Sequence, residues 1–313
     1  MTSEFEIIRR HFSRPAGSAL LGVGDDAALL RPRAGTTLAV STDMLLSGRH
    51  FLPDADPQAL GHKALAVNLS DLAAMGADPR WALLAIALPR ATEKWIAAFA
   101  RGFFRLARRF GTELIGGDTT RGPLVISITV IGEVPRALAL RRDAARAGDD
   151  VWLSGATGEA ALGLAHLKGR VRLAGPARAQ CLRRLHAPEP RIALGRALRG
   201  LARSAIDVSD GLLADLGHIA QASGVAAELR WEDIPRARAI RECRNAALAK
   251  ECLLAGGDDY ELVFTAPRPK RSRIEALGAR RIGTIVRGRP GVRVLDARGR
   301  VVPAPRAGFD HFA

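Results

Sequence analysis

Strand-like apolar runs alternate with helical stretches along the chain, and this alternation predicts an α/β architecture. In the first half, the expected strands and helices are, in chain order, a strand at 36–45, a helix at 58–76, a strand at 79–89, a helix at 92–111, a strand that runs into a glycine turn at 112–122 and a strand at 123–134. The first twelve residues predict a short additional helix that buries Phe5, Ile8 and Phe12.

The alternating pattern restarts near residue 142, where a turn is followed by a new strand and a new helix. The chain has 313 residues, which is long enough for two domains that each have a core of their own. We therefore expect one domain at residues 1–140 and a second at residues 141–313.

The composition indicates a cytoplasmic protein. The longest apolar run, residues 81–89, is far too short to span a bilayer, and the N-terminus has no hydrophobic signal core. Cys181, Cys243 and Cys252 form no CxxC pair and have no metal-ligand spacing, so we expect reduced thiols. No membrane association is expected.

The net charge of +15 raises the question of nucleic-acid binding. The basic residues are mostly arginines scattered over helix surfaces, with no block of five like charges and no interleaved aromatic residues. Only one tyrosine occurs in the chain. This distribution is typical of a solvated surface, so no nucleic-acid partner is expected.

Acidic residues follow apolar runs at six places, always among Gly, Ser or Thr. Strand ends of this kind are where an α/β scaffold places its active site, and hard oxygen ligands suit Mg²⁺. No His/Cys cluster indicates zinc. Taken singly, each segment also fits a turn or a helix cap. The residues are Asp25, Asp26, Ser41, Thr42, Asp43, Asp71, Asp118, Asp207, Ser209, Asp210, Asp258 and Asp259.

Asp71 is the most unusual of these acids, because it lies in a small apolar helix near the negative end of the helix dipole. A buried lone carboxylate is costly unless a positive group meets it. Asn68 lies on the same helix face. We expect Asp71 to point toward a metal shared with other Asp residues; a solvent-facing or arginine-paired Asp71 is the alternative.

The familiar phosphate-binding motifs are absent, since the chain has neither GxxxxGK[ST] nor the protein-kinase set. Instead, seven segments in order are similar to the signatures of the thiamine-monophosphate kinase family. They are GVGDDAAL, STDMLLSGRHF, KALAVNLSDLAAMGADP, LIGGDTTRGPL, SAIDVSDGL, GGDDYEL and GFDHFA. The resemblance covers nearly the whole chain.

The resemblance implies the two-domain fold of aminoimidazole ribonucleotide synthetase. Its N-terminal α/β domain binds ATP and Mg²⁺ and forms a homodimer through its sheet, and its C-terminal domain is α+β. The active site would lie between the domains. The implied reaction transfers a phosphoryl group from ATP to thiamine monophosphate, giving ADP and thiamine diphosphate, with several Mg²⁺ ions.

The resemblance also implies roles for individual residues, which are carried over position by position. The implied Mg²⁺ ligands are Asp26, Ser41, Thr42, Asp43, Asp71, Asp118, Asp207 and Asp210, of which Asp43, Asp71, Asp118 and Asp210 are the catalytic candidates. The implied ATP contacts are Gly117, Asp118, Arg142 and Ser209, with Arg141 as an alternative to Arg142. The implied substrate contacts are His50, Asp258, which is often Glu in the family, and Phe309, which is often a larger aromatic.

Three other functions compete with the kinase. Another ATP-using synthetase of the same fold would give different products, although no catalytic Cys lies near the N-terminus. A basic nucleic-acid binder would show salt-sensitive retention of DNA or RNA and no dependence on the Asp residues. A catalytically idle sensor is disfavoured, because no acidic residue of the motifs is missing.

Overall fold

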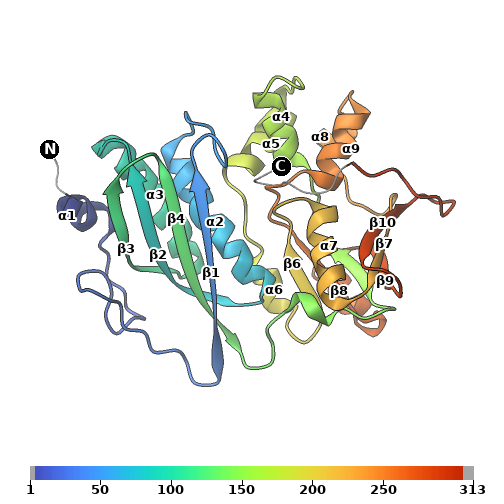
Figure 1. Cartoon of the computed structure of the whole chain (residues 1–313), viewed down its shortest axis with the longest axis horizontal. Coiled ribbons are helices and arrows are strands. Elements are labelled where there is room, and N and C mark those ends of the chain that lie inside the picture. Colours follow the sequence, from blue (N-terminus) through green and yellow to red (C-terminus); the bar gives the residue numbers. More distant parts are fainter. Residues whose placement is uncertain (1–3, 306–313) are drawn as a thin grey trace. The chain divides into compact units, whose positions relative to one another are not determined.

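The computed structural model describes residues 4–305 and divides the chain into two compact units (Figure 1). The first unit consists of residues 1–72 and 77–137, and the second of residues 73–76 and 138–313. Over the described residues, no helix has both the length and the apolar character needed to cross a membrane.

The first unit is built on a four-stranded sheet in the order β1-β4-β2-β3. β1 and β4 are antiparallel, as are β4 and β2, whereas β2 and β3 are parallel. Two long helices, α2 and α3, run along one face of the sheet (Figure 1). The bounds are β1 Thr36–Leu46, α2 Pro57–Ala74, β2 Asp78–Leu88, α3 Glu93–Phe110, β3 Glu113–Arg121 and β4 Val125–Pro135.

The two helices of this unit pack closely because each has a glycine at their contact. A Cβ atom added to Gly61 would lie 2.1 Å from the carbonyl oxygen of Phe99, and one added to Gly102 would lie 1.9 Å from that of Gln58. Such distances are shorter than any van der Waals contact, so no larger residue fits at either position. This contact fixes the first turn of α2 against the middle of α3.

The other face of the sheet leaves apolar side chains of β1 uncovered. Side chains alternate between the two faces of a strand, and in β1 Leu45 is buried while its neighbours are not. Val40 is 61% exposed and Met44 is 56% exposed, and Leu38 and Leu46 are also exposed. The open face of β1 is therefore an apolar surface.

The N-terminal segment differs from the sequence prediction in its buried face. Helix α1 (Glu4–Ile7) continues directly into a π-helical turn, η1 (Ile8–Phe12). Ile7 and Phe12 are buried, but Phe5 is 78% exposed, so the prediction for Phe5 was wrong. A π-turn has more residues per turn than an α-helix, which rotates the buried face by about one residue.

The second unit is built on a six-stranded sheet in the order β10-β7-β9-β5-β8-β6. β10 and β7 are parallel, and every other neighbouring pair is antiparallel. The strand bounds are β5 Asp150–Leu153, β6 Ser204–Asp207, β7 Ala226–Arg230, β8 Leu262–Ala266, β9 Arg280–Val286 and β10 Gly291–Leu295.

Helices and strands of the second unit enclose one core, in which Val151, Ile206, Leu216 and Leu253 are buried. All six strands supply its sheet side, and α4, α5, α7, α8 and α9 supply helical side chains. The bounds are η2 Arg142–Ala144, α4 Glu159–Leu167, α5 Gly175–His186, α6 Ile192–Ala197, α7 Leu212–Ser223, α8 Arg238–Arg241, α9 Ala246–Ala255, η3 Arg268–Lys270 and α10 Arg271–Glu275.

All three cysteines are free thiols, but only one should react in the native protein. Burial raises the pKa of the thiols of Cys181 and Cys252 to about 12, so neither forms a thiolate near neutral pH. Cys243 is half-buried. We expect Ellman's reagent at pH 8 to modify one thiol per chain, and Cys243→Ser to abolish that reaction. Rapid modification of two or three thiols without denaturant would contradict this packing.

Candidate active site

Asp71 is held by the first strand of the sheet. The Ser41 hydroxyl on β1 donates a hydrogen bond to Oδ2 of Asp71 on α2, at 2.5 Å. Both residues are half-buried. The Asp71 carboxylate thus lies, partly covered, at the junction of β1 and α2, and its orientation toward a metal stays a prediction.

Asn68 fixes the same junction one turn earlier on α2. Its Oδ1 accepts a hydrogen bond from the backbone N–H of Asp43 at 3.0 Å, and its Nδ2 donates to the carbonyl of Ala64 at 2.9 Å. Asn68 is almost fully buried, so these bonds replace its lost hydration. The structure thus brings Ser41, Asp43 and Asp71 together. Asp71 lies on α2 itself, and Asn68 of the same helix holds the backbone of Asp43.

Thr42 lies on the opposite face of β1 from Ser41 and Asp43, as strand alternation requires. Its hydroxyl lies 2.8 Å from the hydroxyl of Thr129 on β4, and it is exposed. The structure therefore does not bring the Thr42 side chain to Asp71.

Asp118 lies on β3, at the other edge of the sheet from β1. It is exposed and shares one register row with Ala85, Ser127 and Met44, which places it on the open face. Three strand spacings separate β3 from β1, or about 14 Å. Within one chain, Asp118 is thus far from Asp43.

The position of Gly117, beside Asp118, has no room for a side chain. Its φ is +143°, and an added Cβ would lie 1.9 Å from the carbonyl oxygen of Leu84 on β2. Only glycine fits where the two strands approach this closely. The glycine is explained by sheet geometry, whether or not a nucleotide contacts it.

Two further candidates of the first unit lie in loops. Asp25 and Asp26 are exposed, and Oδ1 of Asp25 accepts a hydrogen bond from the backbone N–H of Asp26 at 2.9 Å. His50 follows β1 and is half-buried, and its Nδ1 accepts from the backbone N–H of Leu46 at 3.0 Å. This bond closes the turn that follows β1.

The remaining acids belong to the second unit, where two loops run side by side. Asp207 ends β6 and is buried, and Ser209 and Asp210 follow it. The backbone N–H of Asp258 donates to the carbonyl of Ser209 at 2.9 Å, and that of Tyr260 donates to Val208 at 2.8 Å. These bonds hold Ser209 and Asp258 next to each other.

Asp258 and Tyr260 have a strained backbone, with φ of +67° and +52°. Non-glycine residues rarely adopt this left-handed conformation, and it costs about 1–3 kcal/mol where it occurs. The Tyr260 hydroxyl donates to Oδ1 of Asp258 at 3.0 Å. Strain of this kind clusters at functional sites, so the loop is a candidate binding loop.

Arg141 and Arg142, the two candidate nucleotide-binding arginines of the second unit, differ in their contacts. Arg141 forms two hydrogen bonds with Asp143, and the longer of them measures 2.9 Å. Arg142 is exposed, its backbone carbonyl accepts a hydrogen bond from the hydroxyl of Ser223, and its guanidinium has no ion-pair partner within residues 4–305. Arg142 is therefore the better placed of the two to meet a new anion. Phe309 lies outside the described residues.

Across residues 4–305, no three side chains among His, Cys, Asp and Glu lie close enough together to hold one metal ion. Mg²⁺ needs fewer protein ligands than that, since it commonly takes one or two carboxylates and completes its shell with water and phosphate oxygens. The paired Ser41 and Asp71 oxygens beside Asp43 are donors of the required hard type.

Comparison with known proteins identifies the family. Residues 24–134 match the family described as AIR synthase related protein, N-terminal domain. The chain is 45% identical over 320 residues to the thiamine-monophosphate kinase of Escherichia coli strain K12, which covers 99% of this chain and 98% of that protein. The chain belongs to the thiamine-monophosphate kinase family.

Solved structures of thiamine-monophosphate kinases have the same fold. The enzyme from Stenotrophomonas maltophilia K279a has a TM-score of 0.84 and 48% identity, and the match covers 95% of this chain and 96% of that one. AaThiL complexed with AMPPCP and TMP has a TM-score of 0.79 and 32% identity, over 90% and 89%. The predicted aminoimidazole ribonucleotide synthetase-like fold, α/β plus α+β, is confirmed.

Asp215 is a site neighbour that the thiamine-monophosphate kinase motifs did not reveal. It lies on α7, and its Oδ2 accepts the backbone N–H groups of Asp210 and Gly211, both at 3.0 Å. Burial, together with the charges of Asp207 and Asp210, raises the pKa of Asp215 to about 8. The one sequence signal for Asp215 is its position five residues after Asp210. An Asp in the first turn of a helix is common, so this position does not by itself indicate a functional residue.

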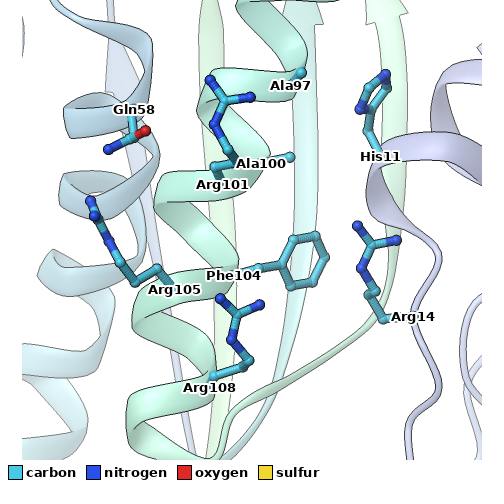
Figure 2. A pocket seen from close by; sticks show the side chains of 9 residues that line it. All are labelled: His11, Arg14, Gln58, Ala97, Ala100, Arg101, Phe104, Arg105 and Arg108. Carbon is cyan, nitrogen blue, oxygen red and sulfur yellow. The ribbon is translucent and has the colours of Figure 1, made fainter.

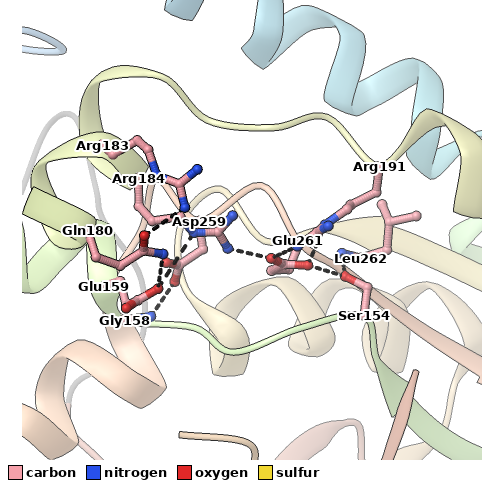
Figure 3. A network of polar contacts seen from close by, with 10 residues as sticks. All are labelled: Ser154, Gly158, Glu159, Gln180, Arg183, Arg184, Arg191, Asp259, Glu261 and Leu262. Atoms are coloured by element: carbon pink, nitrogen blue, oxygen red, sulfur yellow. Dashed lines mark hydrogen bonds and ion pairs between the residues drawn. The ribbon is translucent and has the colours of Figure 1, made fainter. Parts of the chain in front are cut away.

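Asp259, the second acid of GGDDYEL, has no role implied by the family resemblance. It is fully buried, and its Oδ2 accepts the backbone N–H of Gly158 at 2.6 Å (Figure 3). Burial raises the pKa of Asp259 well above its usual value, although the Gly158 bond and the charge of Arg184 oppose this. Asp259 thus anchors the strained loop to the start of α4.

Glu261, two residues further on, is the centre of a buried ion cluster consisting of Glu261, Arg184 and Arg191 (Figure 3). Nε of Arg191 donates to Oε2 of Glu261 at 2.8 Å, and the Ser154 hydroxyl donates to the same oxygen. Burial alone would raise the pKa of Glu261, but the bonds and charges of the two arginines hold it below its usual value. The ion cluster fixes the end of the candidate binding loop.

Proposed function

We propose that this protein transfers the terminal phosphoryl group of ATP directly to thiamine monophosphate, giving thiamine diphosphate and ADP. The full-length identity to a thiamine-monophosphate kinase supports this reaction. The observation that carries it is the match to AaThiL, because that protein of the same fold was obtained with TMP and AMPPCP, an analogue of ATP.

The acceptor in this reaction is a phosphate oxygen, which needs no general base. The second pKa of a phosphate monoester is about 6, so the acceptor is largely ionised at pH 7. The protein's task is to bring two anions together and to hold them in line. A reaction of this kind fits a candidate set of many acids with Arg142 among the nucleotide contacts.

Mg²⁺ ions held by the acids are the second part of the proposal. The candidate ligands are Asp26, Ser41, Asp43, Asp71, Asp118, Asp207 and Asp210, all with hard oxygen donors, together with Thr42, whose side chain lies on the opposite face of β1 from Ser41 and Asp43. Bound Mg²⁺ neutralises phosphate charge and orients the reacting groups. The Ser41 hydroxyl fixes Asp71, and Asn68 fixes the backbone of Asp43, so this corner is built before any ion arrives.

The remaining candidate contacts divide between nucleotide and substrate. We propose that Gly117, Arg142 and Ser209 contact ATP, and that His50, Asp258 and Phe309 contact thiamine monophosphate. The bond from the Asp258 backbone to Ser209 would couple the substrate loop to the nucleotide loop. Tyr260 would orient the Asp258 carboxylate.

We also propose that the protein acts as a cytoplasmic homodimer. The exposed apolar face of β1 is a surface that a second copy would cover, because soluble monomers rarely leave such a face open. Asp118 lies on the same open face as this surface. Sedimentation should therefore give twice the mass of one chain.

A coupled assay of ADP release tests the reaction. With ATP, Mg²⁺ and thiamine monophosphate we expect ADP release at a steady rate, and no release when EDTA is added. Unphosphorylated thiamine is the matched control, because it lacks the acceptor phosphate and should give no ADP. Equal rates with thiamine and its monophosphate, or no ADP with either, would overturn the proposal.

A further inference from the structure

A basic pocket lies on the outer side of α3 in the first unit (Figure 2). It has a volume of about 360 Å³ and is lined by side chains of η1, the segment after η1, α2 and α3. Arg14 comes from the segment after η1, Gln58 from the first turn of α2, and Arg101, Phe104, Arg105 and Arg108 from α3. The term basic pocket refers to this cavity below.

The arginines of α3 are placed on one face of the helix by their spacing. Arg101 and Arg105 are four residues apart, and Arg105 and Arg108 are three apart, so their side chains are neighbours. Like charges at these spacings destabilise a helix. Among the described residues, none of the three has a carboxylate partner, whereas exposed Arg170 forms an ion pair with Glu251.

The fourth arginine of the basic pocket, Arg14, packs against an aromatic ring. The Arg14 guanidinium lies 5.0 Å from the centre of the Phe104 ring, which fixes it over an apolar floor. His11, at the rim, is engaged by Glu93 at 2.8 Å. Four exposed guanidinium groups therefore line an open hollow, and within the described part of the chain none of them has a carboxylate partner.

We propose that the basic pocket binds a small polyphosphate anion. Guanidinium groups form paired hydrogen bonds with phosphate oxygens, and several of them match an anion with adjacent phosphates. The volume falls in the range of small-molecule sites. A nucleic-acid strand fits less well, because Phe104, the phenyl ring that lines the pocket, is buried and offers no free face on which a base could stack.

The basic pocket is separate from the candidate acids of the same unit. Gln58 lines it from the start of α2, and Asp71 lies thirteen residues later on that helix. At 1.5 Å per residue, about 20 Å of helix separates the two. Binding at the basic pocket is thus independent of the proposed catalytic function and can be measured without it.

Titration calorimetry with inorganic tripolyphosphate tests this proposal. EDTA is included so that no Mg²⁺ links the anion to the acidic residues. We expect one binding event per chain, and a loss of affinity of at least about tenfold in the triple variant Arg101→Gln, Arg105→Gln, Arg108→Gln, because each lost guanidinium removes charge-assisted bonds. ATP should displace the anion, and AMP, with a single phosphate, should not.

A second triple variant controls for net charge. Arg280→Gln, Arg287→Gln and Arg289→Gln remove the same charge from exposed positions of the second unit and should leave the affinity unchanged. Thermal melting confirms that both triple variants are folded, and glutamine suits a helix about as well as arginine. Equal affinity of the wild type and the α3 variant would overturn the proposal. Preferential binding of an RNA oligonucleotide that excludes tripolyphosphate would overturn it as well.

Discussion

Replacing Asp71 by Asn should lower the rate of ADP release by about 10³-fold or more while the protein stays folded. The change keeps the shape of the side chain, and its Oδ1 can still accept the hydrogen bond from Ser41. It removes one negative charge from the corner where β1 meets α2. Loss of a group that positions Mg²⁺ and phosphate in the transition state costs about 4 kcal/mol at this rate ratio.

A matched control comes from the other end of the same helix. Oδ1 of Asp56 accepts the backbone N–H of Ala59 at 2.8 Å, as a helix cap, and Asp56→Asn retains such an oxygen. It removes the same charge and should leave the rate within about twofold, since it touches no proposed ligand. If Asp71→Asn kept the wild-type rate with thiamine monophosphate, Asp71 would not belong to the metal site, even though the enzyme would remain a kinase.

The largest expected effect on stability follows from Glu261→Gln. Glu261 has no exposed side-chain surface, and its carboxylate meets both Arg184 and Arg191. The substitution leaves two arginines with no charge at the centre of the ion cluster, although Glu159 lies 3.9 Å from Arg184. Removing one partner of a buried ion pair lowers the free energy of unfolding by about 3 kcal/mol or more. We expect the melting temperature to fall by about 6–12 °C.

Glu251→Gln is the matched control for that experiment. Glu251 pairs with Arg170 at 3.0 Å, but both side chains are about half exposed. Exposed pairs contribute less than about 1 kcal/mol, so the melting temperature should hardly change. Similar shifts in the two variants would mean that burial adds nothing to the Glu261 cluster, against the packing described above.

The pH dependence of the ion cluster has a defined sign. Because the arginines hold the pKa of Glu261 below its ordinary value of 4.5, the unfolded chain takes up a proton at higher pH than the folded one. The stability from Glu261 is therefore fully present above pH 4.5 and is lost as the pH falls through the lowered pKa. Glu261→Gln should show less of this acid-induced loss than the wild type.

Parts of the fold were predictable because local pattern and tertiary structure agree. α3 has a continuous apolar face and Gly111 at its C-terminus, and its expected range of 92–111 is within one residue of Glu93–Phe110. α5 and β10 were not predicted, because α5 is rich in arginine and β10 is only five residues long. The order of the strands was not predicted either, since β4 pairs between β1 and β2 over long range.

The same distinction applies to the candidate site. The meeting of Asn68 and Asp71 with β1 follows from helix spacing, because residues three apart share a face. The separation of Asp118 from Asp43 depends on strand order, which local sequence does not specify. The roles of Asp215, Asp259 and Glu261 depend on burial in the folded second unit, which shifts the pKa of all three, and Asp259 and Glu261 also have long-range arginine partners.

Phosphorus NMR of one reaction mixture tests the central claim most directly. With ATP, Mg²⁺, thiamine monophosphate and the protein, the proposed in-line transfer predicts that the two signals of thiamine diphosphate grow in step with those of ADP, with little free phosphate. ADP and inorganic phosphate without thiamine diphosphate would contradict it, and would indicate instead another ATP-using enzyme of the same fold.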